Sequence, residues 1–230
     1  MQYLGGKNSL AKYIVPHIQE ALCSRRVYCE PFVGGASIVS RVAHTERLAS
    51  DMHPQLVALY QAVQKGWEPP TLAITAADYA HVKANQDSLD PAWVALVGFG
   101  SSFGAKWFGG YAARPGYNFL AGSWRSLQKK MRTCQDVSFG CCSYTEYTGI
   151  KDAVIYCDPP YDNTTGYSTG RFDSAAFWAW CSKMAEHNTV LVSEFSHPEG
   201  TEVLWQKDRK TILRSNERQD MSETLVRVFG

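Results

Sequence analysis

The chain has 230 residues, of which 45% are hydrophobic and 20% are charged, and its formal net charge is +1. This composition is typical of an ordinary soluble globule with one domain, or with one domain and a large insertion. No apolar run approaches the length of a membrane-spanning helix, and residues 1–7 lack the pattern of a signal peptide, so we expect a cytoplasmic protein.

The cysteines and histidines show no pattern of a disulfide framework or a metal site. The seven cysteines are an odd number and contain no Cys-x-x-Cys pair, and the six histidines do not pair with them at ligand spacing. We therefore expect free thiols in a reducing compartment and no bound metal.

The first 65 residues alternate helices and strands. Asn8 or Ser9 can cap the first helix, Pro54 stands in the first turn of a later one, and Gly66 ends it. In chain order, the hydrophobic periodicity predicts a helix over 8–24, a strand over 26–30, a helix over about 37–43, a strand ending at 48–51 and a helix from 54 to about 64.

This alternation breaks down between residues 66 and 133. A glycine- and aromatic-rich stretch at 98–111 does not fit a regular element. Helices are expected on either side of it, near 76–86, 90–98 and 122–132. We predict an inserted subdomain over 66–135, with 1–65 and 136–230 forming the main domain.

The inserted segment has an uneven charge. No acidic residue occurs between Asp90 and Asp136, so the stretch 91–135 carries +6 and, by subtraction from +1, the rest of the chain carries −5. A basic segment in an otherwise acidic chain predicts a surface for a polyanion, whereas a merely solvated face usually mixes both signs. The basic residues are Lys106, Arg114, Arg125, Lys129, Lys130 and Arg132.

Strands and helices alternate again in the C-terminal part. The pattern predicts a strand over 153–157, a helix near 174–187 that Asp173 can cap, a strand over 189–193, and short strand-like runs over 201–229 that include 223–228. The polar loop between them contains Asn163 to Tyr167, which could form a lid or an ordinary surface loop.

The tetrapeptide Asp158-Pro159-Pro160-Tyr161 follows the apolar run 153–157. Its acid therefore lies at the carboxyl end of a strand, where open α/β sheets bind their ligands. The prolines lack N–H donors and leave nearby carbonyls without a competing partner. A carboxylate, a carbonyl and an aromatic ring can together hold a planar amine, although a Pro-rich turn with Asp158 as a cap residue is also consistent with this pattern.

Two further stretches suggest a place for a cofactor. Gly34 and Gly35 lie between a strand and a helix, so the backbone can approach a ligand closely. Asp51 ends the next strand, where Rossmann-like folds bind a ribose, but it could also cap the following helix. The absence of Gly-x-Gly-x-x-Gly favours S-adenosylmethionine (SAM) over a dinucleotide.

The N-terminal stretch Tyr3-Leu4-Gly5-Gly6-Lys7 is the remaining piece. Gly5 and Gly6 could wrap a small ligand and Lys7 could pair with its carboxylate. A flexible N-terminus is the alternative reading.

Taken in order, these motifs resemble those of the Dam-type DNA adenine-N6 methyltransferases, the D12 class or alpha group, and in particular small phage-like members. Tyr3 to Lys7 resembles the N-terminal Gly-Gly-Lys motif, Glu30 to Ala36 the SAM-binding motif, and Asp158 to Tyr161 the catalytic motif. The resemblance spans nearly the whole chain, with the basic insert in place of the target-recognition domain. It implies an α/β, Rossmann-like SAM-dependent methyltransferase fold with a mainly helical insert.

The resemblance also implies roles for single residues in a monomer that flips an adenine out of double-stranded DNA. Asp158, Pro159, Pro160 and Tyr161 would be catalytic. SAM would contact Tyr3, Gly5, Gly6, Lys7, Phe32, Gly34, Gly35, Asp51 and Asp158. Lys129 and Lys130 would contact phosphates, Arg114 and Arg125 bases or phosphates, and Lys106 and Arg132 would complete the DNA surface.

Three alternatives fit parts of this pattern. The same tetrapeptide could serve an RNA adenine-N6 methyltransferase or a DNA cytosine-N4 methyltransferase. A catalytically idle nucleic-acid-binding protein could also retain the fold. The intact tetrapeptide, glycine turn and Asp51 favour an active enzyme, with a biological role in restriction–modification, host evasion or regulation.

Overall fold

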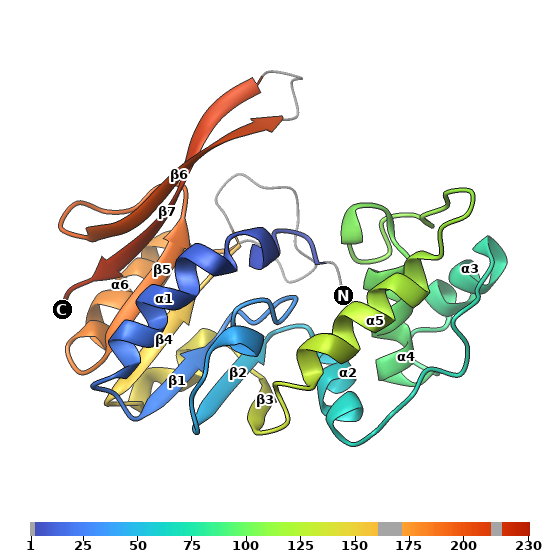
Figure 1. The fold of residues 1–230 in the computed structure, drawn as a ribbon, viewed down its shortest axis with the longest axis horizontal. Coiled ribbons are helices and arrows are strands. Elements are labelled where there is room, and N and C mark those ends of the chain that lie inside the picture. Colours follow the sequence, from blue (N-terminus) through green and yellow to red (C-terminus); the bar gives the residue numbers. More distant parts are fainter. Residues whose placement is uncertain (1–2, 161–171, 213–217) are drawn as a thin grey trace.

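A computed structural model of the protein describes residues 3–160, 172–212 and 218–230. Tyr161 and the expected lid at 163–167 lie outside the described residues. A mixed sheet organises the described part of the chain, with the strand order β3-β2-β1-β4-β5-β7-β6 (Figure 1). Its strands are β1 (Val27–Glu30), β2 (Arg47–Asp51), β3 (Val137–Cys141), β4 (Ala153–Cys157), β5 (Thr189–Glu194), β6 (Glu202–Ile212) and β7 (Arg218–Val228).

The side of β1 on which successive strands are added changes between β3 and β4. Strands β3, β2, β1, β4 and β5 run parallel to one another, whereas β7 runs antiparallel to both β5 and β6. The chain moves outward from β1 to β2 and β3, then returns to place β4 on the other side of β1. Ligands of open α/β sheets bind at this switch point, outside the carboxyl ends of the strands.

Helices cover both faces of the sheet, because successive side chains of its buried strands point to opposite faces. On β1, Tyr28 belongs to the apolar cluster shared with α1 (Ala11–Leu22) and α2 (Pro54–Gln64), and Cys29 to the cluster shared with α6 (Ser174–Ala185). The short 3-10 helices are η1 (Lys7–Ser9), η2 (Val39–Arg41), η3 (Phe103–Ala105) and η4 (Tyr144–Gly149).

Three helices lie between α2 and β3 in the chain and occupy one side of the molecule (Figure 1, green). They are α3 (Ala76–Ala84), α4 (Pro91–Gly100) and α5 (Phe119–Met131). Helix α4 is apolar on almost every side, because it packs against α2, α3 and α5. These helices therefore share one continuous apolar cluster with the sheet.

The fold class predicted from the sequence is confirmed, with corrections at single elements. The expected helix over 37–43 is only the short η2, because Ala36 has a φ of +51° and Val42 is extended. Strand β3 was missed at the edge of the sheet. The short runs expected over 201–229 are the two long strands β6 and β7, which extend together beyond the sheet (Figure 1, red).

No helix in the described ranges is both long enough and apolar enough to cross a membrane.

Candidate active site

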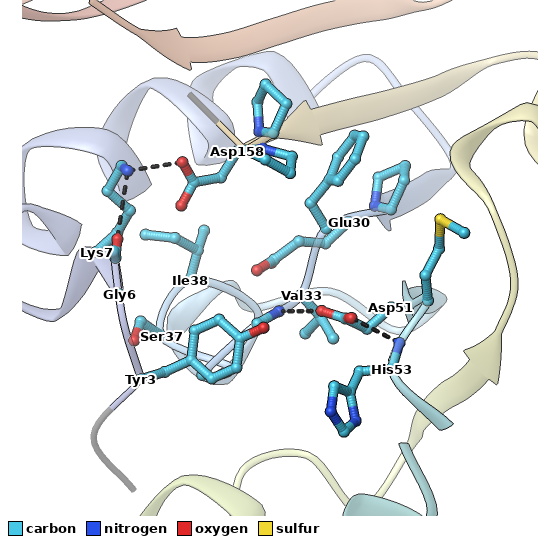
Figure 2. Close-up of a pocket in the computed structure, with 18 of the residues that line it drawn as sticks. Tyr3, Gly6, Lys7, Glu30, Val33, Ser37, Ile38, Asp51, His53 and Asp158 are labelled. Carbon is cyan, nitrogen blue, oxygen red and sulfur yellow. Dashed lines mark hydrogen bonds and ion pairs between the residues drawn. The ribbon is translucent and has the colours of Figure 1, made fainter. Parts of the chain in front are cut away.

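A cavity of about 270 Å³ lies at the carboxyl ends of β1, β2 and β4, at the switch point of the sheet (Figure 2). It brings together side chains and turns that are far apart in the sequence. The predicted site residues that line it are Tyr3, Gly5, Gly6, Lys7, Phe32, Gly34, Gly35, Asp51, Asp158, Pro159 and Pro160. The predicted catalytic and cofactor-binding residues that the structure describes therefore lie together in this cavity, whereas Tyr161 is not described.

Asp51 organises the turn on the floor of the cavity. Its Oδ2 accepts a hydrogen bond from the Gly34 N–H at 3.0 Å, and its Oδ1 accepts one from the His53 N–H at 3.0 Å (Figure 2). Burial raises the pKa of this carboxyl, and the backbone donors partly oppose the shift. Since a carboxylate has about four acceptor positions, Asp51 can still accept hydrogen bonds from a ligand.

Residues 34 and 35 of the turn must be glycine because Tyr3 of the N-terminal segment packs closely against them. Gly34 has a φ of +42°, and a Cβ there would lie 3.0 Å from the Tyr3 ring. A Cβ on Gly35 would lie 2.7 Å from the Tyr3 Cβ, closer than real Cβ atoms approach a neighbour. The Tyr3 ring itself packs against Phe99 of α4, with the ring centroids 5.1 Å apart. Tyr3 is therefore a wall of the cavity that contacts both the glycine turn and the inserted helices.

Lys7 forms a buried ion pair with the catalytic-motif acid. Its Nζ lies 2.6 Å from Asp158 Oδ1 and 3.0 Å from Glu223 Oε1 on β7, and only 3% of its side chain is exposed. Burial alone would lower the pKa of Lys7, but the two carboxylates outweigh it and the pKa is raised. The sequence predicted a ligand carboxylate as the partner of Lys7. In the structure, two carboxylates of the chain itself take this place.

Glu30 was not among the predicted site residues, although it lines the cavity at the end of β1. Its side chain points into the space between Asp158 and the glycine turn (Figure 2). Burial raises its pKa to about 8, while the Tyr28 hydroxyl, which donates to Glu30 Oε2 at 2.6 Å, opposes the shift. The signal was available, because Glu30 follows a buried strand just as Asp158 does.

Aromatic rings form the side of the cavity next to the inserted helices. The His53 ring lies 5.0 Å from that of Phe99 and 4.2 Å from that of Trp107, measured between centroids. Burial lowers the pKa of His53 to about 4, so the ring is neutral at physiological pH. Its Nδ1 accepts a 3.4 Å hydrogen bond from the Leu56 N–H and caps α2. His53 acts here as an apolar wall and a helix cap.

Five of the six basic residues predicted to contact DNA are exposed. They are Lys106, Arg114, Arg125, Lys129 and Arg132. Lys130 is the exception and corrects the prediction, since it is 8% exposed and its ammonium donates to the Gly35 carbonyl and, at 3.0 Å, to Ser37 Oγ. A helix turns about 100° per residue, so the neighbours Lys129 and Lys130 point to different surroundings.

Sequence comparisons agree with the geometry of the cavity. A family profile described as D12 class N6 adenine-specific DNA methyltransferase matches residues 3–88. A DNA adenine methylase of Vibrio cholerae is 26% identical over 267 aligned positions, which cover all of this chain and 95% of that protein. Over residues 3–88 the chain therefore matches the D12 class, and over its full length it resembles DNA adenine methylases of the Dam type.

Two further relatives of this Dam-type group match along most of their length. A DNA adenine methylase of Haemophilus influenzae is 23% identical and covers all of this chain and 93% of its own. The retron Ec67 DNA adenine methylase of Escherichia coli is 21% identical and covers 94% of this chain and 79% of its own. In this chain, the N-terminal motif, the glycine turn and the strand-end acids line one continuous cavity.

Proposed function

We propose that this protein transfers a methyl group from SAM to the N6 amine of an adenine in double-stranded DNA. The observation that carries the proposal is the position of Asp158. It stands at the switch point of the sheet, beside a cavity lined by a glycine turn and Asp51, in a chain of the Dam type.

The residues of the cavity fit SAM. The glycine turn lets the Tyr3 wall pack closely against the floor of the cavity, and Asp51 holds that turn while keeping acceptor capacity for a ribose diol. Tyr3 and His53 supply apolar walls, and Phe32 lines the opposite part of the cavity. When bound, SAM supplies a methyl group on a cationic sulfonium.

Lys7 serves in this proposal as a positioning residue. Its ammonium fixes Asp158 from one side and is itself held by Glu223. Because a carboxylate has two oxygens, Asp158 can contact Lys7 and still offer an acceptor toward the cavity. The ion pair thus keeps the acid charged and oriented.

The amine is captured by acceptors of the tetrapeptide. Asp158 and the Pro159 carbonyl accept the two N6 hydrogens, which draws the nitrogen lone pair out of conjugation. Tyr161 stacks on the flipped base, a contact worth about 1–3 kcal/mol in comparable systems. The proton leaves to Asp158 or to water after transfer. Positioning contributes most of the acceleration, because no strong base is needed.

Residues 66–135 form the DNA-recognition part in this proposal. The exposed Arg125 and Lys129 on α5, together with Lys106, Arg114 and Arg132, attract the phosphate backbone. The target adenine has to leave the duplex to reach Asp158, which costs a few kcal/mol. A single copy of the chain contains every group named in these steps.

The decisive test is Asp158→Ala in a tritiated-SAM transfer assay on duplex DNA. We expect at least a 1,000-fold loss of transfer, in line with the roughly 10²–10⁴-fold effects of positioned acid–base groups. Asp87→Ala, at an exposed position after α3, is the matched control and should keep full activity. Full activity of Asp158→Ala would rule out the mechanism.

The same assay discriminates between substrates. Label in RNA instead of duplex DNA would indicate an RNA methyltransferase. Nucleoside analysis of labelled DNA would distinguish N6-methyladenine from N4-methylcytosine. Transfer to neither RNA nor DNA would exclude both the RNA methyltransferase and the DNA methyltransferase.

A further inference from the structure

The buried ammonium of Lys130 joins the inserted helices to the floor of the cavity. Lys130 belongs to the last turn of α5, and its Nζ donates to the Gly35 carbonyl and the Ser37 hydroxyl. Gly35 and Ser37 both line the cavity, whereas Lys130 does not. The hydrogen bonds of Lys130 therefore reach the cavity through this turn, and its charge also acts on Glu30.

A second contact ties the end of α5 to the same segment. The Thr133 hydroxyl donates to the Ser40 carbonyl at 2.7 Å, and Arg47 donates to the Thr133 carbonyl at 2.7 Å. The segment that follows the glycine turn is thus held at one end by Lys130 of α5 and at the other by Thr133, just after the helix. A shift of α5 would move the turn with it, because packed and hydrogen-bonded elements transmit displacement.

The other side of α5 carries exposed positive charge. Arg125 and Lys129 are exposed on this helix, and Lys129 precedes the buried Lys130 in the chain. One helix thus presents cations to solvent and a third cation to the turn of the cavity. A polyanion that contacts the exposed cations would act on the element that holds Gly35.

Charged groups surround the Lys130 ammonium unequally. Burial and, to a smaller extent, Arg41 lower its pKa to about 8, while Glu30 and Cys134 oppose the shift. A buried ammonium is costly unless its hydrogens find acceptors. The Gly35 and Ser37 oxygens supply acceptors. The hydrogen bonds of Lys130 to these two oxygens therefore have a defined geometry, which an apolar contact would lack.

We propose that Lys130 is a positioning residue that couples DNA contact at α5 to SAM binding at the Gly35 turn. The inference rests on the proposed function, since it assigns the cavity to SAM and the exposed face of α5 to DNA. Coupling of this kind is reciprocal: DNA changes the Kd for SAM by the factor by which SAM changes the Kd for DNA.

The experiment measures the Kd for SAM by calorimetry with and without a saturating mixed-sequence DNA duplex. For the unmodified protein we expect DNA to tighten SAM binding by about 5-fold or more, the lower end of typical allosteric factors. In Lys130→Met that factor should fall to about 1, because the chain length is kept and the donors are lost. Lys130→Arg, which restores a charged donor, should recover part of it.

Lys151→Met is the matched control, because it removes the same charge from an exposed position next to β4, away from α5 and the cavity. It should leave both DNA binding and the coupling factor unchanged. Circular dichroism establishes that each variant is folded. Should Lys130→Met fail to fold, Ser37→Ala removes one of the two acceptors and should lower the factor at least twofold.

The outcomes separate this inference from the proposed function. Suppose that the protein methylates DNA, but that Lys130→Met, or Ser37→Ala in its place, retains the full coupling factor. Lys130 then has only a structural role, and the inference is overturned. An unmodified protein that methylates DNA without any effect of DNA on SAM affinity overturns it as well. A protein that neither binds SAM nor methylates DNA refutes the proposed function itself.

Discussion

The two sides of the cavity are built from different chemistry. The sheet side places three acids, Glu30, Asp51 and Asp158, at the carboxyl ends of neighbouring strands. The insert side contributes Phe99 and Trp107, which pack against the lining residues Tyr3 and His53. Strands hold polar groups at fixed positions, whereas the inserted helices supply an apolar cover and the Lys130 ammonium.

This difference predicts different consequences of mutation. Changes on the insert side should act mainly on stability, because they remove buried apolar area. Changes on the sheet side should act mainly on ligand binding and on pH dependence. The following experiments test this contrast, from the largest expected effect to the smallest.

Phe99→Ala should destabilise the protein by about 3–5 kcal/mol, the usual cost of removing a buried aromatic side chain. Phe99 is 5% exposed and contacts Tyr3, His53 and Trp107. Urea unfolding followed by fluorescence measures the effect. Phe103→Ala is the control, because that ring is 76% exposed and should change the free energy of unfolding by less than about 0.5 kcal/mol. Equal losses in both variants would contradict the assignment of the apolar wall.

Gly35→Ala should weaken SAM binding by about 10- to 100-fold, corresponding to the roughly 1–3 kcal/mol cost of overpacking. The new Cβ would lie 2.7 Å from the Tyr3 Cβ, an atom too close to the backbone to rotate away. Calorimetric titration with SAM measures the change. Gly149→Ala, where the added Cβ meets no atom within 4 Å, should bind SAM normally. Unchanged affinity in Gly35→Ala would show that the turn does not hold the cofactor.

Glu30→Gln should change how stability depends on pH. The folded-state pKa of about 8 lies above the ordinary value of 4.5, so the contribution of protonated Glu30 is complete below pH 4.5 and is lost as pH rises toward 8. Between these values, unfolding free energy of the unmodified protein should fall relative to Glu30→Gln by up to about 1.4 kcal/mol per pH unit. Urea unfolding of both proteins at pH 5, 6, 7 and 8 would measure the difference in the free energy of unfolding. Parallel curves would contradict it, and exposed Glu46→Gln serves as the control.

Lys129→Gln should lower the slope of log K against log[salt] for DNA binding by about 1, because one phosphate contact is lost. Arg125→Gln should do the same if it contacts a phosphate. Lys151→Gln removes an equal charge next to the amino end of β4, away from the cavity, and should keep the slope. An unchanged slope in the α5 variants would show that DNA binds to another surface of the protein.

Hydrophobic pattern was sufficient to predict most of the sheet and the shared position of its strand-end residues. Strands β1, β2, β4 and β5 are buried runs, and the residues that follow them meet at one edge as parallel pairing requires. Strand β3 escaped notice because only alternate residues of this edge strand are buried. Strands β6 and β7 were underestimated because they pair with each other along a polar, extended hairpin.

Long-range pairing of charged residues could not be predicted. Nothing near Lys7 in the sequence indicates Glu223, and nothing near Lys130 indicates the Gly35 carbonyl. Charge counting placed all six cations of residues 91–135 on the surface, although helical periodicity around Leu127 and Met131 could have placed Lys130 inside. Such contacts depend on tertiary packing, which local pattern does not encode.

The contact between Lys7 and Glu223 has a practical consequence for protein engineering. The ammonium that holds Asp158 is also paired with Glu223 on β7, so segments near the two ends of the sequence meet beside the cavity. A truncated version ending before residue 223 would retain every recognisable motif and yet lose this anchor. Fusion partners and split-protein designs should therefore leave both segments in place, and gene fragments that contain only the motifs should not be counted as complete enzymes.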